Sequence, residues 1–307
     1  MKNTYVFGHK NPDTDSIISS IVMTDLEKKM GNENVQACRI GNINKETEYI
    51  LNYFNVQAPT LIEKVTSDDT VILVDHNGFG QSADGITNAK ILKVIDHHNV
   101  SGFETSYPLF YMAQPVGCTA TILYELFVMN NYEISKTNAG LLLSAIISDT
   151  LLFKSPTCTP KDVKVAEELA KIAEIDIQSY GLDMLKAGTD LSDFSIEEIL
   201  NVDAKEIDFK DVKSIVDQVN TASIEDVMKM KSNLEAGMQK VIDEKGLDLF
   251  MLLITDIINS NSQVIALGKR ADLVEKSYDV KLENNTALLK GVVSRKKQVV
   301  PVMTENA

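Results

Sequence analysis

The stretch FGHKNPDTDS, residues 7–16, joins a predicted strand to a predicted helix close to the start of the chain. Residues 4–8, TYVFG, are rich in β-branched and aromatic residues and predict a short strand. Thr14 or Ser16 can cap the helix that follows, and Gly31 can end it. A turn that carries one histidine and two aspartates, in the pattern Asp-x-Asp, therefore lies between a strand and a helix.

Sequence patterns typical of strands and helices alternate along the chain as far as residue 174. Six further elements are predicted, namely strands over 35–40, 70–75 and 90–96 and helices over 44–54, 118–131 and 159–174. Thr159 at the N-cap and Pro160 at the first helical position mark the start of the last helix. This alternation predicts an α/β fold with a mostly parallel sheet flanked by helices.

A break in the apolar periodicity divides the chain. The segment 186–195 is rich in Gly, Asp, Ser and Thr, which is typical of a linker. Further elements follow it, namely a helix over 223–246 and strands over 247–257 and 262–268. We therefore expect a first domain over 1–187, a linker over 188–195, and a second, smaller α/β domain over 196–307, with a cleft between the domains.

Composition and charge exclude several classes of protein. With 307 residues and 44% apolar content, the chain can bury a substantial core. The formal net charge of −14 opposes binding to nucleic acid or to an anionic membrane. The longest apolar stretch, residues 139–147, is too short to cross a bilayer, and the N-terminus has no sustained apolar run. We expect a cytoplasmic protein. Cys38, Cys118 and Cys158 are too scattered for a disulfide framework or a zinc knuckle.

Side chains that can bind metal follow three of the predicted strands. The sequences HKNPDTD, DHN and DHH each begin where a strand ends, and the carboxyl ends of parallel strands are where ligands bind. All four histidines lie in these turns: His9, His76, His97 and His98. Together with the neighbouring aspartates and the SDT at 148–150, they form a set too rich for one metal ion. Imidazole and carboxylate ligands suit manganese or cobalt, with magnesium at purely oxygen positions.

Each motif also has a purely structural interpretation. NPDTD is a good turn sequence, DHH can lie at a sheet edge, and SDT can end a helix. A purely structural interpretation would have to explain why ligand-type residues follow three separate strands. The conjunction of these motifs therefore favours a site for two metal ions. A pair of ions about 3.5–4 Å apart activates water and stabilises the oxygens of a phosphoryl transfer.

A basic cluster lies near the other end of the acidic chain. SRKKQ, residues 294–298, contains Arg295, Lys296 and Lys297. Alone, such a cluster is usually a solvated surface. Beside a two-metal site it suits a phosphoryl group, because arginine binds two phosphate oxygens at once and lysine adds a point charge.

The motifs GHKNPDTDS, VDHN, DHH and SRKKQ, in this order, resemble those of the family II, manganese-dependent inorganic pyrophosphatases of the DHH phosphoesterase superfamily. Relatives that degrade short oligonucleotides or polyphosphate are expected to carry a glycine-rich motif near the end, which LLKGVVSRKKQ does not show. The resemblance implies hydrolysis of pyrophosphate to two phosphates by a hydroxide that bridges two divalent metals. A phosphoesterase acting on short oligonucleotides or polyphosphate is the alternative.

The resemblance also implies roles for the residues that match the motifs. Six would be metal ligands, with His9 and Asp13 on one manganese ion, Asp15, His97 and Asp149 on the other, and Asp75 bridging both. Four would bind the substrate, namely His98, Lys205, Arg295 and Lys296. Asp75 and His98 would be the catalytic residues, the latter as hydrogen-bond donor or acid. Asp96 would orient the neighbouring histidines, and His76 could do the same.

Further expectations concern cofactors and assembly. The resemblance implies two Mn²⁺ per subunit, which Co²⁺ can replace, and Mg²⁺ that arrives with the pyrophosphate. It also implies an active site in the cleft between the domains and a homodimer formed through the first domain. One mild departure from the family is Gly78, where an acidic residue is common.

Two rival interpretations come from other classes of protein. GFGQSA, residues 78–83, satisfies the dinucleotide-binding pattern G-x-G-x-x-A after a predicted strand. The segment before the next strand is too short for a crossover helix, so we interpret the match as accidental. The other rival is a metal-stabilised binding protein without catalysis, which metal-dependent release of phosphate from pyrophosphate would exclude.

Overall fold

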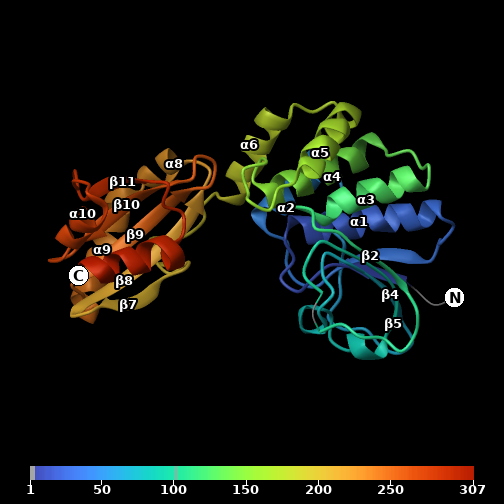
Figure 1. The fold of residues 1–307 in the computed structure, drawn as a ribbon, viewed down its shortest axis with the longest axis horizontal. Helices are drawn as coiled ribbons and strands as arrows, with labels where there is room; N and C mark the ends of the chain where they lie inside the picture. Colours follow the sequence, from blue (N-terminus) through green and yellow to red (C-terminus); the bar gives the residue numbers. More distant parts are fainter. Residues whose placement is uncertain (1–3, 101) are drawn as a thin grey trace. The chain divides into compact units, whose positions relative to one another are not determined.

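The computed structural model describes residues 4–100 and 102–307 of the chain (Figure 1). The chain forms two compact units, the first ending at Gly188 and the second covering Thr189–Ala307. Helix α6 (Ile177–Gly188) closes the first unit, and α7 (Ile196–Ile199) is the first helix of the second. No helix within the described residues is long and apolar enough to cross a membrane.

The first unit is built on a six-stranded sheet in which all paired strands are parallel, in the order β3-β2-β1-β4-β5-β6. Its strands are β1 (Thr4–Phe7), β2 (Val35–Arg39), β3 (Thr60–Leu61), β4 (Thr70–Val74), β5 (Lys90–Asp96) and β6 (Phe110–Ala113). The prediction of a mostly parallel sheet is confirmed. Successive strands are added on one side of β1 and then on the other, so the order reverses between β1 and β4. Such a reversal opens a crevice at the carboxyl ends of the strands.

Helices and short turns cover opposite faces of this sheet (Figure 1). Helices α1 (Thr14–Lys29) and α3 (Thr119–Met129) pack against strands, and α4 (Lys136–Thr150) and α5 (Pro160–Ala173) pack behind them. The other face is covered by the 3-10 turns η1 (Phe79–Gln81) and η2 (Ile86–Asn88). Because the chain between β4 and β5 forms only these turns, the segment 78–83 lacks the helix that a dinucleotide-binding motif needs.

The caps of two helices test the sequence predictions directly. Thr159 caps α5 in a capping box with Asp162, and Pro160 follows it, as predicted. The predicted cap of α1 is wrong. Its N-cap is Asp13, whose backbone is extended and whose carboxylate accepts a hydrogen bond from Ser16 N at 3.0 Å. Aspartate is as good a cap as serine, and the hydroxyl of Thr14 is engaged elsewhere.

Helix α2 (Lys45–Tyr53) packs against α6 at the edge of the first unit. Asn44 caps it by accepting a hydrogen bond from Thr47 N at 2.8 Å. The predicted helix over 44–54 is therefore present. One side chain of its first turn reaches two other helices, α1 and α4.

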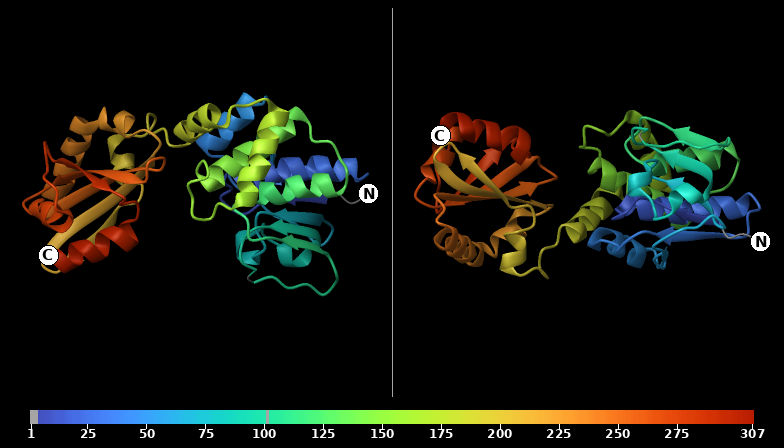
Figure 2. Two further views of the ribbon diagram at one scale, coloured as in Figure 1. Left: turned by 45° about the horizontal axis from the view of Figure 1, so that its top comes forward. Right: turned by 90° about the horizontal axis from the view of Figure 1, so that it is seen from below.

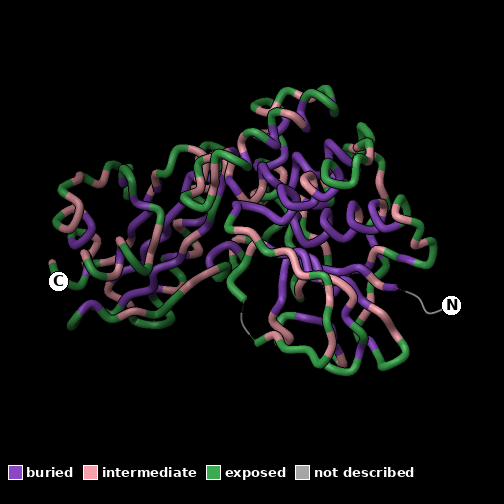
Figure 3. The backbone as a smooth tube through the Cα atoms, turned by 45° about the vertical axis from the view of Figure 1, so that its right-hand side comes forward, coloured by how far each residue is buried: buried purple, intermediate pink, exposed green. Residues whose placement is uncertain are grey.

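The second unit has a five-stranded mixed sheet in the order β11-β10-β9-β8-β7. Its strands are β7 (Lys205–Phe209), β8 (Val212–Thr221), β9 (Leu249–Asp256), β10 (Asn261–Leu267) and β11 (Thr286–Lys290). Every residue of the central strand β9 is buried, and its apolar side chains alternate between two core clusters, one on each face. Figure 3 shows buried residues gathered in the interior of each unit. The prediction of a second, smaller α/β domain is confirmed.

Helices lie on both faces of this sheet (Figure 2). The single helix predicted over 223–246 is wrong, because the chain forms α8 (Ile224–Met228) and α9 (Lys231–Lys245). A tightened turn separates them, in which Met230 N donates to Val227 O. The opposite face carries α10 (Asp272–Tyr278) and α11 (Val300–Asn306), with the basic SRKKQ segment in an irregular helical turn just before α11.

Candidate metal centre

The polar side chains of the first unit gather where neighbouring parallel strands end. His9 lies two residues beyond β1, Asp75 follows β4 directly, and His97 and His98 follow β5. Strands β1 and β4 are the pair between which the strand order reverses. The fold therefore places these groups at the crevice where ligands of parallel α/β sheets bind.

Asp75 lies at the centre of this cluster. Its Oδ2 is 3.4 Å from His9 Nε2, and its Oδ1 is 3.4 Å from His97 Nε2 and 3.6 Å from His98 Nδ1. The side chain is buried, and Oδ2 has no hydrogen-bond partner among the described residues. A buried oxygen without a hydrogen-bond partner is rare in proteins. A bound cation would supply the missing partner.

The backbone of Asp75 is held in an uncommon conformation. Its φ is 56°, in the left-handed region that few non-glycine residues adopt and that aspartate tolerates better than most. Asp75 N donates to Ile95 O of the neighbouring strand at 2.9 Å, which fixes the peptide at the end of β4. Strained residues of this kind cluster at functional sites, because the surrounding structure has to hold them in place.

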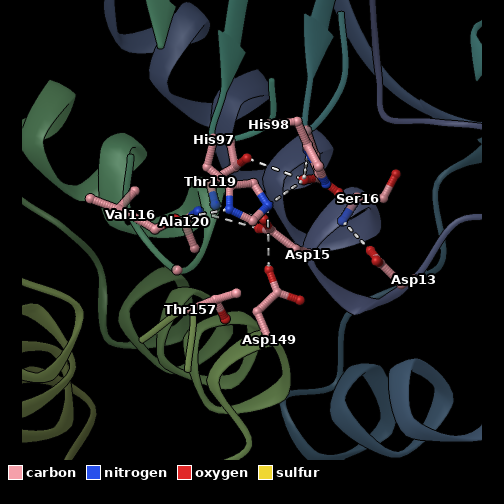
Figure 4. A network of polar contacts seen from close by, with 12 residues as sticks. Asp13, Asp15, Ser16, His97, His98, Val116, Thr119, Ala120, Asp149 and Thr157 are labelled. Carbon is pink, nitrogen blue, oxygen red and sulfur yellow. Dashed lines mark hydrogen bonds and ion pairs between the residues drawn. The ribbon is translucent and has the colours of Figure 1, made fainter. Parts of the chain in front are cut away.

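Three groups of side chains have ligand atoms within 4.8 Å of one another and could hold a metal ion. They are His9 with Asp13 and Asp75, Asp15 with His97 and Asp149, and Asp75 with His97 and His98. The structure thus brings together every residue that the resemblance implies as a metal ligand. Figure 4 shows the His97 ring above Asp149, with Asp15 beside them and Asp13 farther to the right. The donor set is imidazole and carboxylate, which fits manganese.

Neighbouring charges shift the pKa values of the cluster residues. Burial lowers the pKa of His9, but the carboxylates of Asp13 and Asp75 outweigh burial and raise that pKa to about 11. Burial likewise lowers the pKa of His97, whereas its contacts with Asp75 and Asp15 raise it, with a net value of about 9. For Asp75, burial raises the pKa, but His9 and His97 outweigh burial and hold it below its usual range.

Two further carboxylates of the cluster, those of Asp15 and Asp149, have raised pKa values. Burial and the negative charge of Asp75 raise the pKa of Asp15 to about 7. Burial and the charge of Asp15 raise the pKa of Asp149 well above its ordinary value. Asp15 and Asp75 are buried and Asp149 is largely so, and the three lie so close together that the protein's own groups leave their negative charge incompletely compensated. A divalent cation beside them would supply that compensation.

Helix α3 fixes the orientation of Asp15. Thr119 N donates to Asp15 Oδ2 at 2.7 Å and Ala120 N to Oδ1 at 3.2 Å, so the carboxylate occupies the N-terminus of α3, where the helix dipole favours negative charge. Ser19 Oγ donates to Oδ1 at 2.8 Å. The hydroxyl of Thr119 also donates to Asp75 Oδ1 at 3.3 Å. One residue therefore contacts carboxylates of two of the metal-binding groups.

Hydrogen bonds also fix the histidine rings. The Nδ1 of His97 lies 3.1 Å from Val116 O, which turns Nε2 toward the carboxylates. The Nδ1 of His98 lies 2.9 Å from Asp96 Oδ1, as expected for an orienting carboxylate. His76 belongs to none of the metal-binding groups, because its two ring nitrogens contact Val74 O and Ser82 Oγ in the interior.

The sequence analysis did not identify Glu46. Its Oε1 accepts hydrogen bonds from Thr14 Oγ1, at 2.7 Å, and from Ser148 Oγ. Thr14 stands between Asp13 and Asp15, and Ser148 precedes Asp149 in the sequence. Burial raises the pKa of Glu46. This carboxyl group therefore links the two helix ends that carry three of the ligand-type aspartates.

We expect Glu46→Ala to weaken manganese binding about 10- to 100-fold, the usual effect of losing a group that orients metal ligands. Equilibrium dialysis against manganese measures the change. Glu48→Ala is the matched control, because Glu48 is exposed on the same helix. Equal manganese affinity in the two variants would show that Glu46 does not orient the ligands.

The turn after Asp149 is also unusual. Leu151, Leu152 and Phe153 have φ values of 47°, 52° and 68°, so three successive non-glycine residues are left-handed. Leu152 is buried and its N donates to Ile147 O at 3.0 Å, which ends α4 abruptly. The consequence is that Asp149, in the last turn of α4, lies at the end of the helix beside His97 and not within a continuing helix.

The basic residues singled out in the sequence lie in the second unit. Arg295 is mostly buried, with 14% of its side chain exposed, whereas Lys205 is 61% exposed. Lys296 and Lys297 are exposed as well. Asp203 contacts two of them, Arg295 and Lys205.

Two family descriptions match the chain and together cover most of it. The DHH family, N-terminal domain, matches residues 3–146, and the DHHA2 domain matches residues 182–306. The fold and the aspartate–histidine cluster thus define a two-domain protein of the DHH class.

Similar proteins narrow the class. A Bacillus subtilis protein named manganese-dependent inorganic pyrophosphatase is 54% identical over 306 residues, 99% of both chains. A Bacillus velezensis protein named probable manganese-dependent inorganic pyrophosphatase is equally similar, again over 99% of both chains. A crystal structure from Methanococcus jannaschii, described as a "putative family II inorganic pyrophosphatase", shares 40% identity and a TM-score of 0.65, with 99% of each chain covered. The chain belongs to the family of manganese-dependent inorganic pyrophosphatases.

Proposed function

We propose that this protein hydrolyses inorganic pyrophosphate to two phosphates with two manganese ions bound in the first unit. The observation that carries the proposal is the position of Asp75, whose two oxygens face different histidines, His9 and His97. A single carboxylate between two groups of ligands is the arrangement that a two-metal phosphoryl-transfer site requires. The names of the close relatives supply the substrate.

Six side chains would hold the ions. His9 and Asp13 would bind one ion, Asp15, His97 and Asp149 the other, and Asp75 would bind both. When bound, the ions supply Lewis acidity, which acidifies a water molecule and neutralises charge on phosphoryl oxygens. Cobalt could replace manganese, since it accepts the same ligands, and the substrate would arrive as a magnesium complex.

His98 is the residue of the cluster best placed to contact the substrate. Its side chain is 52% exposed, far more than that of His9 or His97. The hydrogen bond to Asp96 raises its pKa, so the ring is inclined to carry a proton. We infer that His98 donates a hydrogen bond to a phosphate oxygen and can deliver a proton to the departing phosphate.

The second unit would supply cations for the phosphates. Lys205, Arg295 and Lys296 would bind the oxygens that carry negative charge during in-line displacement, with Arg295 binding two of them at once. This assignment accounts for a basic cluster in a chain whose net charge is −14.

The proposal extends to assembly and location. A homodimer would form through the first unit, where β6 is the edge strand and Phe110 is 44% exposed. An edge strand presents unpaired backbone groups that a second copy can pair with. We place the enzyme in the cytoplasm, where pyrophosphate from biosynthetic reactions would be its substrate.

Phosphate release from three substrates tests the function. Pyrophosphate, tripolyphosphate and a short oligonucleotide are compared, each with manganese, cobalt or magnesium. We expect rapid release from pyrophosphate with manganese or cobalt and little from the other two substrates. Comparable turnover of the oligonucleotide would instead assign the protein to phosphoesterases that act on nucleic acid.

A further inference from the structure

One acidic residue of the second unit contacts two of the cations assigned to the substrate. Asp203 Oδ2 lies 2.9 Å from Arg295 Nη2, and the main-chain oxygen of Asp203 accepts a hydrogen bond from Arg295 Nη1. Asp203 Oδ1 lies 3.9 Å from Lys205 Nζ. An aspartate among phosphate-binding cations weakens their positive field, so its presence calls for a physical reason.

The contacts of Arg295 show which part of its side chain is used. Asp203 binds the edge formed by the two terminal nitrogens, Nη1 and Nη2, and Nη1 also lies 3.4 Å from Val216 O. Among the described residues, Arg295 Nε has no hydrogen bond. The N–H of Nε and the second N–H of Nη2 therefore remain for a ligand. Together they form an edge of the guanidinium that can bind two phosphate oxygens side by side.

Strand β8 holds both partners of this ion pair in place. Asp203 N donates to Asp217 Oδ1 at 3.1 Å, and Asp217 is fully buried. Arg295 N donates to Gln218 Oε1 at 3.2 Å. Neighbouring residues of one strand thus fix the backbones of Asp203 and Arg295, so the contact between them is part of a framework and not a chance surface pair.

We propose that Asp203 is a positioning residue for the substrate. It holds the guanidinium of Arg295 by one edge so that the other edge faces the phosphate, and it keeps the ammonium group of Lys205 nearby. The inference rests on the proposed function of Arg295 and Lys205. Preorganisation explains the acidic residue, since a free arginine or lysine side chain loses rotamer entropy when it is fixed on binding.

Two substitutions separate positioning from charge. Asp203→Ala removes the side-chain acceptor, whereas Asp203→Asn keeps an oxygen for Arg295 Nη2 and removes the charge. Loss of a hydrogen bond to a charged group corresponds to a change of about ten-fold or more in binding. We therefore expect Asp203→Ala to raise KM for pyrophosphate about ten-fold with little change in kcat. Asp203→Asn should restore KM to within about two-fold of wild type.

Asp208→Ala is the matched control. Asp208 is exposed on β7, and its replacement changes the net charge by the same amount. Manganese content and thermal unfolding of each variant are measured in parallel and should match wild type. An unchanged KM in Asp203→Ala would overturn the inference. A lower KM in both Asp203 variants would overturn it too, because Asp203 would then be an anion that competes with the substrate.

A binding measurement distinguishes failure of this inference from failure of the proposed function. Calorimetry with imidodiphosphate, a non-hydrolysable analogue of pyrophosphate, measures affinity for the manganese-loaded wild type and variants. If wild type releases no phosphate from pyrophosphate, the proposed function fails. If wild type is active and binds imidodiphosphate no more tightly than Asp203→Ala does, only the positioning role fails.

Discussion

Replacement of Asp75 by asparagine should abolish two-metal binding and lower phosphate release by about 10³-fold or more, because each ion contributes several kcal/mol to transition-state stabilisation. The carboxylate has one oxygen toward His9 and the other toward His97. Asparagine keeps the shape of the side chain but replaces one oxygen with an amide nitrogen, which cannot ligate a cation, and removes the negative charge. One group of ligands would then lose its oxygen, and the other would keep only a neutral amide oxygen in place of a carboxylate.

Metal content per chain measures this result directly. The protein is dialysed against manganese and then against metal-free buffer, and the manganese that remains is determined by elemental analysis. Wild type should retain two ions and Asp75→Asn fewer than one. Asp68→Asn, a change at an exposed aspartate of the same unit, serves as control. Two tightly held ions in Asp75→Asn would refute the bridging role.

Chelation of manganese should strongly lower the thermal stability of the chain. A ligand present at a thousand times its Kd stabilises the folded state by about 4 kcal/mol per site, and two sites are proposed. Differential scanning calorimetry with and without EDTA measures the shift in Tm. The Asp75→Asn variant should show almost none, and a full shift in that variant would show that the stabilising sites lie elsewhere.

The size of this shift should increase with pH. In the protein itself the pKa of Asp15 is raised to about 7, so the folded chain holds a proton that the unfolded chain releases near pH 4. The metal-free chain therefore loses stability as pH rises from about 4 to 7. The raised pKa of His9 acts in the same direction above its unfolded value of about 6.5. Bound manganese requires deprotonated ligands, so the stabilisation by metal should be larger at pH 8 than at pH 5.

The ligand-type residues could be predicted from sequence because they follow strands that are easily recognised. The run TVILV before Asp75 and the run KILKVI before Asp96 are rich in β-branched residues, most of which are buried, so their strand conformation was apparent. The carboxyl ends of parallel strands meet at one edge of a sheet, which places His9, Asp75 and His97 together. The proximity of these three residues follows from the topology of the sheet.

The residues that orient the ligands could not be predicted in this way. Glu46 contacts Thr14 across 32 positions of sequence, and Thr119 contacts Asp15 across 104. Both lie in ordinary amphipathic or apolar helices, and nothing local distinguishes Glu46 from Glu48. Their roles arise from the packing of α2 and α3 onto the rest of the first unit, which no short pattern encodes.

Three other features were predicted wrongly or not at all, because the sequence signal for each is ambiguous or weak. Asp13, Thr14 and Ser16 can each cap a helix, and only the backbone conformation of Asp13 decides between them. The break between α8 and α9 carries no glycine or proline, so the sequence marks it with no signal. The edge strand β7 buries only Phe209, and the edge strand β11 alternates exposed and buried residues over a short length, so both are weak strand patterns.

The left-handed turn at Leu151–Phe153 bears on any effort to make the enzyme withstand heat. Left-handed backbone costs about 1–2 kcal/mol for each non-glycine residue, a large fraction of the 5–15 kcal/mol that separates a typical folded domain from its unfolded chain. A laboratory selection for durability alone would favour variants that relax this bend. A relaxed bend would let α4 run on past Thr150 and would change the surroundings of the Asp149 carboxylate beside His97, so we expect a gain in durability at this turn to lower turnover.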